Sequence, residues 1–410
     1  MSADDITRAF MPNRAGLDLG RDLLLDPPPQ AGLPSLADGP VGADQALRDL
    51  AGAVLSGAAH LDAPGFFAHM DPATPWITWV TGQWAARLNQ NLLHSDTGAI
   101  ARDLEQRVVD FLAPTWGMDG GHMVPGSTIA NLTALWAARD LHHVTSVVAS
   151  AAAHVSVGKA ARLLGLHYRQ VPIDPQGRLD LRHLGDVTES AVVLTAGTTS
   201  TGAVDPLERP DAPWVHIDAA WAGPLALSTQ WRHLLDGIEH ADSVAVSAHK
   251  WLHQPKESAL IMFKDSVVAH QALGFGGAYL AVPNIGVLGS HGYAALPLAA
   301  TILAYGLDGL ASWVDHGMHL ATRLVAGIAS HPDLEQWGAG PGTGVVAWRH
   351  RTADSRIIQS RLEGAFVSVT MIDERDWLRS VAANPLADPE LVIAAVVAAA
   401  DRADIHASGL

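Results

Sequence analysis

Short apolar segments that alternate with helical stretches constrain the fold of this 410-residue chain more than any other feature. Between positions 146 and 263, each of these segments is a nearly uninterrupted apolar run, not an alternation of apolar and polar residues. Strands of this kind are buried on both faces, which is typical of a parallel sheet covered by helices. We therefore predict an α/β fold. The predicted strands lie at 146–149, 191–195, 214–217, 243–246 and 259–263, with helices such as 130–141 and 155–164 alternating with them.

The length of the chain predicts more than one domain, because a single hydrophobic core rarely serves more than about 250–300 residues. We expect an N-terminal arm and helix over 1–60, a large domain over 61–308 and a small C-terminal domain over 309–410. The expected elements near and after the second boundary are helices at 293–306 and 308–330, strands near 344–349 and 365–371, and a last helix from about 388.

Charge and hydropathy exclude several classes of partner. The chain has 42 acidic and 26 basic side chains and a formal net charge of −16, whereas binding to a phosphate backbone needs clustered cations. The longest apolar run, 392–400, is shorter than the roughly 20 residues that span a bilayer. The first residues lack the basic and apolar regions of a signal peptide. We expect a soluble, cytoplasmic protein that binds neither nucleic acid nor membranes.

Reactive side chains of two kinds are scarce. There is no cysteine, which excludes disulfides, thiolate nucleophiles and cysteine-based metal sites. The only lysines are Lys159, Lys250, Lys256 and Lys264. Lys250 lies in an apolar stretch, whereas Lys256 and Lys264 flank predicted loops and Lys159 lies on an amphipathic helix. Lys250 is therefore the first candidate for chemistry that needs a primary amine.

Two polar side chains follow predicted strands, at the edge of a parallel sheet where ligands usually bind. Asp218 follows the strand 214–217, and Lys250 comes shortly after the strand 243–246. A lysine can condense with an aldehyde cofactor, and a carboxylate can keep a pyridine nitrogen protonated so that the ring withdraws electrons. Together they indicate a pyridoxal 5′-phosphate site. Taken singly, Asp218 could be a turn residue and Lys250 a surface amine.

Hydroxyl and imidazole groups around these positions could complete such a site. Ser127 and Thr128 begin a predicted helix, where backbone N–H groups and hydroxyls can bind a phosphate or merely cap the helix. Ser247 lies three residues before Lys250 and could add a third hydroxyl. His154 opens the next helix and could either stack on a flat cofactor or only begin that helix.

A metal site is the main alternative. His216 and Asp218 alternate onto one side of a strand, and His249 and His253 would share one face of a helix. The chain has no His-Glu-x-x-His motif, the pattern of many zinc hydrolases. A metal-dependent hydrolase or a cofactor-free binding protein is thus the alternative to a pyridoxal phosphate enzyme.

The order and content of these motifs resemble the group II family of pyridoxal-phosphate-dependent amino acid decarboxylases, which has the aspartate aminotransferase fold (fold type I). The resemblance extends over about 60 to 400. It is carried by segments 66–70, 89–91, 126–132, 154–164, 195–206, 218–221, 247–256 and 377–381. It implies a mostly parallel seven-stranded sheet covered by helices, a small C-terminal α/β domain and a homodimer with active sites at its interface.

The same resemblance implies roles for individual residues. Lys250 would bind the cofactor covalently, Asp218 would contact the pyridine nitrogen, and His154 and Ala220 would pack on the two faces of the ring. The implied phosphate ligands are Ser127, Thr128, Ser247 and His249, and Thr198 would lie near the 3-hydroxyl of the ring or the substrate. The residues implied on the substrate side are Phe67, His69, Asn91 and Arg379.

The implied activity is decarboxylation of an L-amino acid to an amine and CO₂. The segment 274–291 departs from the family, because it is short and Gly289-Ser290-His291 has His where the family has Arg. Tyr279 is the expected proton donor to the carbanion, with Tyr293 as a competitor. If neither reaches Cα, the alternative is a transaminase, another lyase or a decarboxylative oxidative deaminase on the same fold.

Overall fold

The computed structural model describes residues 9–36, 39–278 and 280–408, and the chain divides into two compact units, Met1–His60 and Leu61–Leu410. The first unit contains α2 (Arg14–Leu25) and α3 (Ala43–Val54), which pack on each other. None of the side chains of α2 is buried, and α3 buries only Ala51 and Gly52. The first unit thus contributes little to a hydrophobic core.

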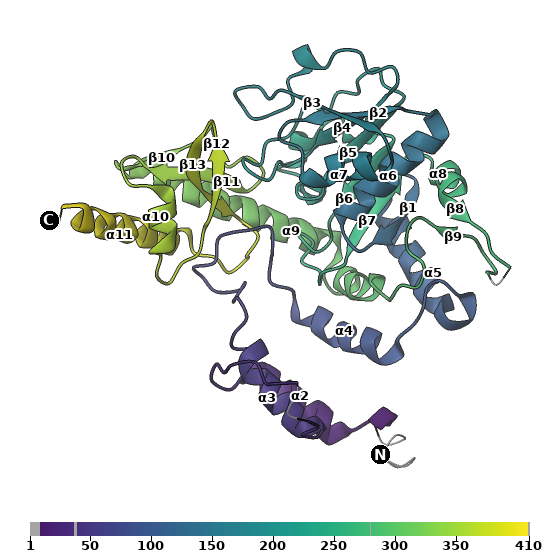
Figure 1. Cartoon of the computed structure of the whole chain (residues 1–410), viewed down its shortest axis with the longest axis horizontal. Coiled ribbons are helices and arrows are strands. Elements are labelled where there is room, and N and C mark those ends of the chain that lie inside the picture. Colours follow the sequence, from purple (N-terminus) through teal and green to yellow (C-terminus); the bar gives the residue numbers. More distant parts are fainter. Residues whose placement is uncertain (1–8, 37–38, 279, 409–410) are drawn as a thin grey trace. The chain divides into compact units, whose positions relative to one another are not determined.

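A seven-stranded sheet forms the centre of the second unit (Figure 1). Its strands, in the order β1-β7-β6-β5-β4-β2-β3, pair in parallel from β3 to β6, and β7 pairs antiparallel with both β6 and β1. This confirms the predicted mostly parallel sheet. The strands are β1 (Gly120–Val124), β2 (Ser146–Ser150), β3 (His167–Val171), β4 (Ser190–Thr195), β5 (Trp214–Asp218), β6 (Ser243–Val246) and β7 (Ala259–Phe263).

Helices cover both faces of this sheet because successive strand side chains point to opposite faces. Val147 and Ala149 of β2 pack in a core with α6, α7 and α8, whereas Val148 packs in a second core with α5 and α9. The helices are α4 (Trp76–Leu88), α5 (Ser95–Leu112), α6 (Ser127–His142), α7 (Val155–Leu163), α8 (Ser266–Leu273) and α9 (Ala295–Ser330). Burial on both faces explains why these strands are apolar throughout.

The long helix α9 connects two cores. It is interrupted at Gly306, whose φ of 66° and ψ of −179° are not helical, in agreement with the two helices expected at 293–306 and 308–330. Leu298 and Leu310 belong to the core under the large sheet, whereas Leu324 and Ile328 pack in the C-terminal core. By length and composition alone α9 could cross a membrane. Within its apolar window, 33% is buried in the described structure.

The C-terminal region contains an antiparallel sheet in the order β10-β11-β13-β12, together with α10 (Ser355–Ser360) and α11 (Pro389–Ser408) (Figure 1). Its strands are β10 (Leu334–Gln336), β11 (Val345–His350), β12 (Ser368–Ile372) and β13 (Arg375–Val381). A further short pair, β8 (Gly274–Phe275) and β9 (Asn284–Ile285), follows α8. Since residues 61–410 form one compact unit, the expected division at 308/309 stays a prediction.

Two stacked tryptophans join the large sheet to the C-terminal region. The rings of Trp221 and Trp251 lie 4.3 Å apart between centroids, and both side chains are buried. The indole Nε1–H of Trp221 donates to the Thr343 carbonyl at 2.7 Å, and that of Trp251 donates to the Ala382 carbonyl at 2.8 Å. These contacts fix the loops after β5 and β6 against the small sheet.

Replacing Trp251 with phenylalanine tests this connection. Loss of the indole N–H leaves the buried Ala382 carbonyl without its donor, which should lower the free energy of unfolding by about 1–3 kcal/mol. Thermal or urea denaturation measures the change. Trp136→Phe is the matched control, since Trp136 donates to the more accessible Asp140 and should change stability by less than about 0.5 kcal/mol. Equal effects of the two substitutions would contradict this account.

Candidate active site

A cavity of about 230 Å³ lies at the carboxyl ends of β4, β5 and β6, beside the N-termini of α6 and α7. The structure brings eight of the residues named from the sequence together on its lining. They are Ser127, Thr128, His154, Asp218, Ala220, Ser247, His249 and Lys250. These residues come from four separate segments of the chain, so their convergence is a property of the fold.

Lys250 is the lysine best suited to react as an amine. In the described part of the chain, no group forms a hydrogen bond or an ion pair with its Nζ. Burial lowers the pKa of Lys250, which favours the neutral, nucleophilic amine. By contrast, Lys256 pairs with Asp71, and Lys264 donates to two backbone carbonyls.

Asp218 ends β5 as a buried carboxylate, only 4% exposed. Its Oδ1 accepts the Ala220 N–H at 3.1 Å, and its Oδ2 accepts from the amide Nδ2 of Asn131 at 2.7 Å. No cationic side chain of the described residues forms an ion pair with it. A buried carboxylate of this kind needs a positive partner, and a protonated pyridine nitrogen in the cavity would supply one.

The N-terminus of α6 provides an anion site. Gly126 precedes Ser127 as the N-cap and gives the helix no side-chain cap, so the first N–H groups remain available to a ligand. The hydroxyls of Ser127 and Ser247 lie 2.6 Å apart across the cavity wall. A Cβ on residue 126 would lie 3.6 Å from Cε1 of His249, which places that ring beside the helix start. These groups fit a phosphate.

The loop after β4 presents other hydroxyls than the one singled out from the sequence. Thr195 and Thr199 line the cavity, whereas the Thr198 hydroxyl lies 2.9 Å from that of Thr201 and accepts the Ala203 N–H at 3.0 Å. The Thr198 hydroxyl is therefore engaged within its own loop. The Thr195 hydroxyl is buried and has no protein partner in the described region, so it is available to a ligand.

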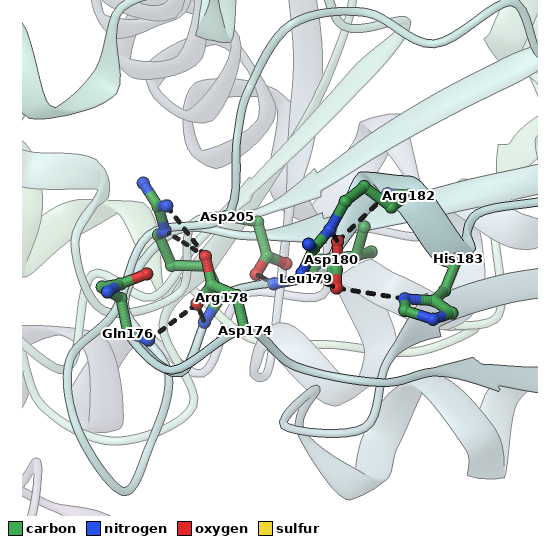
Figure 2. A network of polar contacts seen from close by, with 8 residues as sticks. All are labelled: Asp174, Gln176, Arg178, Leu179, Asp180, Arg182, His183 and Asp205. Atoms are coloured by element: carbon green, nitrogen blue, oxygen red, sulfur yellow. Dashed lines mark hydrogen bonds and ion pairs between the residues drawn. The ribbon is translucent and has the colours of Figure 1, made fainter.

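Asp205 holds both ends of this loop in place. Its carboxylate accepts the Thr195 N–H at 2.8 Å. It also accepts the Leu179 N–H at 2.6 Å, which ties the loop to segment 174–183 (Figure 2). In that segment, Asp174 binds Arg178 and Asp180 binds Arg182 (Figure 2). Burial raises the pKa of Asp205 to about 6, against the two backbone donors that favour its charge.

The residues expected on the substrate side are dispersed. Phe67 is buried in the C-terminal core, His69 lies against Phe366, and Asn91 donates to the Ser290 hydroxyl at 3.1 Å. Arg379 lies next to the cavity wall, where its Nε–H donates to the Thr199 carbonyl and its Nη1–H to Ser368. Burial lowers the pKa of Arg379 to about 10, and no carboxylate of the described residues pairs with it. Tyr279 lies outside the described residues.

Sequence reasoning missed several cavity residues, including Met70, Thr195, Gly197, Thr199 and Trp221. It also assigned no role to Asn131, which reaches Asp218. A signal for Asn131 was present, because Asn131 lies four residues after Ser127 and therefore shares its helix face. The sequence held no comparable signal to show which hydroxyls of segment 195–199 line the cavity, since this depends on how the loop folds.

Residues 34–351, most of the chain, match the pyridoxal-dependent decarboxylase conserved domain. The chain belongs to this family. Aspartate 1-decarboxylase of Aliivibrio fischeri is 30% identical over 299 residues, which cover 58% of this chain and 55% of that protein. L-2,4-diaminobutyrate decarboxylase of Acinetobacter baumannii is 27% identical over 72% of this chain and 69% of its own length. The chain thus spans little more than half of the first relative and about two thirds of the second.

Several solved structures share the fold. Mouse CSAD superposes with a TM-score of 0.85 at 21% identity, covering 94% of this chain and 98% of that one. The Oryza sativa TDC structure with PLP and tryptamine has a TM-score of 0.82 at 23% identity, covering 98% and 99%. The fold is therefore that of the fold type I enzymes. The cofactor of the family is pyridoxal 5′-phosphate. The residues of the cavity fit this group, because Lys250 offers an amine, Asp218 a buried carboxylate and the start of α6 a set of donors for the phosphate.

Replacing Lys250 with alanine should remove the covalent attachment of the cofactor. Wild-type protein incubated with pyridoxal phosphate should turn yellow, and borohydride should fix the cofactor on the peptide that contains Lys250. Absorbance spectra and peptide mass spectrometry measure both effects. Lys264→Ala is the control and should keep the absorbance, because Lys264 binds backbone carbonyls instead of lining the cavity. Labelling of any other lysine would refute the assignment.

Proposed function

We propose that this protein converts an L-amino acid to the corresponding amine and CO₂ with pyridoxal phosphate as cofactor. The observation that supports this best is that two groups line one cavity: the Lys250 amine, which has no hydrogen-bond or ion-pair partner among the described residues, and the buried Asp218 carboxylate, which has no cationic partner among them. Membership of the decarboxylase family and the relatives that decarboxylate amino acids support the reaction. The relatives act on acidic, basic and aromatic amino acids, so they support an amino acid substrate as a class.

Each group on the cavity has a task in this reaction. Bound pyridoxal phosphate supplies an electron sink for the pair released from the Cα–carboxylate bond. Asp218 would hold the ring nitrogen in its protonated form, and the Lys250 amine would hold the cofactor covalently until a substrate amine takes its place. The start of α6 holds the phosphate, while the buried guanidinium of Arg379 offers a cation beside the cavity.

Decarboxylation to an amine requires a group that protonates Cα, and the described cavity lining leaves the identity of that group open to a second candidate function. Among the described residues that line the cavity there is no tyrosine, and His291 lies in a neighbouring cavity with Glu105 and His122. Two imidazoles of the described residues line the cavity, His154 and His249. Since His249 lies beside the start of α6, His154 is the one proposed to deliver a proton. If it does not, the carbanion has another fate, and the product is an aldehyde or an oxo acid, as in a decarboxylative oxidative deaminase or a transaminase.

A panel of L-amino acids tests the reaction. Purified protein with pyridoxal phosphate should release CO₂ and amine in equal amounts from at least one amino acid, measured by CO₂ capture and mass spectrometry. Asp218→Asn should lower kcat/KM by about 10²–10³-fold, the usual cost of removing one charge-stabilising group. Asp211→Asn, an exposed residue, should leave it unchanged. Turnover that yields aldehyde or oxo acid without amine would favour the second candidate.

We also propose that the protein is a homodimer with active sites at the interface. One face of α4 carries an apolar stripe at helical spacing, formed by Trp76, Trp79, Val80, Trp84 and Leu88. These side chains are between 39% and 62% exposed, and Leu303 of the adjoining α9 is exposed as well. Monomeric proteins rarely expose a continuous apolar patch of this kind, whereas dimer interfaces are rich in tryptophan. We propose that a second copy of the chain packs on this stripe.

Charges placed on this stripe should disrupt the dimer. Trp79→Asp combined with Trp84→Asp should shift the protein from dimer to monomer, because two carboxylates would lose water on association. Analytical ultracentrifugation measures the mass. The control is Ile357→Asp on α10, an exposed apolar residue of the C-terminal region that should leave the mass unchanged. A wild-type protein that sediments as a monomer would disprove the dimer.

A further inference from the structure

Asn131 is the centre of a buried hydrogen-bond network behind Asp218. It lies on α6 and is completely buried. Its Nδ2 donates to Asp218 Oδ2 at 2.7 Å and to the Ser156 hydroxyl at 2.9 Å, and its Oδ1 lies 3.0 Å from Nε2 of His216. Both the amide nitrogen and the amide oxygen of Asn131 thus have hydrogen-bond partners.

The direction of the hydrogen bonds follows from the chemistry of the partners. A carboxylate only accepts, so the amide nitrogen of Asn131 must face Asp218 and the amide oxygen must face His216. His216 therefore carries its proton on Nε2. Burial lowers the pKa of His216 to about 4, so the ring is neutral near pH 7. With the ring proton on Nε2, Nδ1 accepts from the Ser243 hydroxyl at 2.9 Å, and the Ser243 carbonyl, which cannot donate, lies 3.2 Å from the same nitrogen. That hydroxyl in turn accepts the Nε1–H of Trp214 at 3.0 Å.

A second branch of the network determines the protonation of His154. The Ser156 hydroxyl accepts from Asn131, so its own proton is free to go to Nδ1 of His154, 2.8 Å away. The same Nδ1 also accepts the Ser156 backbone N–H at 3.2 Å, which caps the start of α7. With two donors directed at it, Nδ1 is unprotonated. The neutral ring then carries its proton on Nε2, the nitrogen that is not part of the network.

We propose that Asn131, Ser156, His216 and Ser243 are positioning residues that set the protonation pattern of the cofactor site. Through Asn131, they hold Asp218 as a charged acceptor for the pyridine nitrogen. Through Ser156, they hold His154 as a neutral ring with an Nε2–H donor available to the cavity. The inference rests on the proposed cofactor chemistry, and it adds the residues that prepare the site before any ligand binds.

Two structural features distinguish this role from simple packing of α6 on the sheet. Apolar side chains of α6 such as Ala134 and Leu135 already pack that helix against the strands, so a polar network is not needed for adhesion. The hydrogen bonds of the network also all point in the same direction. Trp214 donates to Ser243, Ser243 to His216, His216 to Asn131, and Asn131 to the acceptor Asp218. Every group in it is oriented by the next.

Asn131→Asp tests the proposal, because it keeps the shape of the side chain and exchanges the donor for an acceptor. It should weaken cofactor binding to the apoprotein about 10- to 100-fold, a loss typical of partners that orient a ligand-binding group. An absorbance titration with pyridoxal phosphate measures the dissociation constant. Thr133→Val is the matched control, since the buried Thr133 hydroxyl on the same helix donates to the Ile129 carbonyl and to no group of the network. The control should bind the cofactor like the wild type.

The state of His154 gives a readout that needs neither cofactor nor turnover. In ¹⁵N-histidine NMR spectra of the full-length protein, the His154 signal, assigned by its loss in His154→Asn, should show a neutral ring protonated on Nε2. Asn131→Asp should alter this signal, and Thr133→Val should not. A wild-type His154 protonated on Nδ1, or wild-type cofactor affinity in a folded Asn131→Asp protein, would overturn the proposal.

Two further arms keep the test decisive. If Asn131→Asp does not fold, His216→Asn replaces it, with His350→Asn as control, because His350 is a buried histidine bonded only to its own turn in the C-terminal region. His216→Asn should weaken cofactor binding, and His350→Asn should not; equal affinities would overturn the proposal. If the wild type does not bind pyridoxal phosphate, the proposed function fails, and the NMR signal of His154 alone decides on the network.

Discussion

The arrangement of this protein depends on one buried negative charge, that of Asp218, at the end of a central strand. A carboxylate withdrawn from water is costly unless donors and a cation compensate it. The chain supplies two N–H donors, from Ala220 and Asn131, but no cation in ion-pair contact among the described residues. The uncompensated part of that charge is what a pyridoxal phosphate site uses, because the ligand brings the missing positive nitrogen.

The rest of the fold can be understood as the support of that carboxylate. The parallel register pairs Thr195 with Asp218, which brings the end of β4 beside the end of β5. A hydrophobic core packs on each face of the sheet, and the Trp221–Trp251 stack fixes the loops that follow β5 and β6. Asp205 stabilises the loop after β4, because its carboxylate accepts the backbone N–H groups of Thr195 and Leu179, which are distant in the sequence. Rigid loops are needed here because a site works only when its groups are held in place before the ligand arrives.

Much of the fold was predictable because the signals for buried strands and for helices are local. Strands β5, β6 and β7 lie where continuous apolar runs predicted them, within a residue at each end. Strand β3 was missed, since His167–Val171 lies at the edge of the sheet and exposes most of its side chains, so it lacks an apolar run. Strand β13 was likewise not recognised, because its charged residues, such as Arg375 and Asp376, interrupt the pattern of a sheet with one solvated face.

The sequence by itself determined the reactive groups: four lysines, no cysteine, and a single lysine placed in an apolar stretch after a buried strand. It also determined where the buried strands β2, β4, β5, β6 and β7 lie, because each is a continuous apolar run along the chain. Only the tertiary structure decided which neighbours those groups meet. Asn131, Ser156 and His216 reach one another across 25 and 85 residues of chain, and Thr195 and Thr199 face the cavity where Thr198 does not. The reason is that a side chain's direction depends on strand register and loop closure, which are set by contacts between distant segments and leave no mark on local spacing.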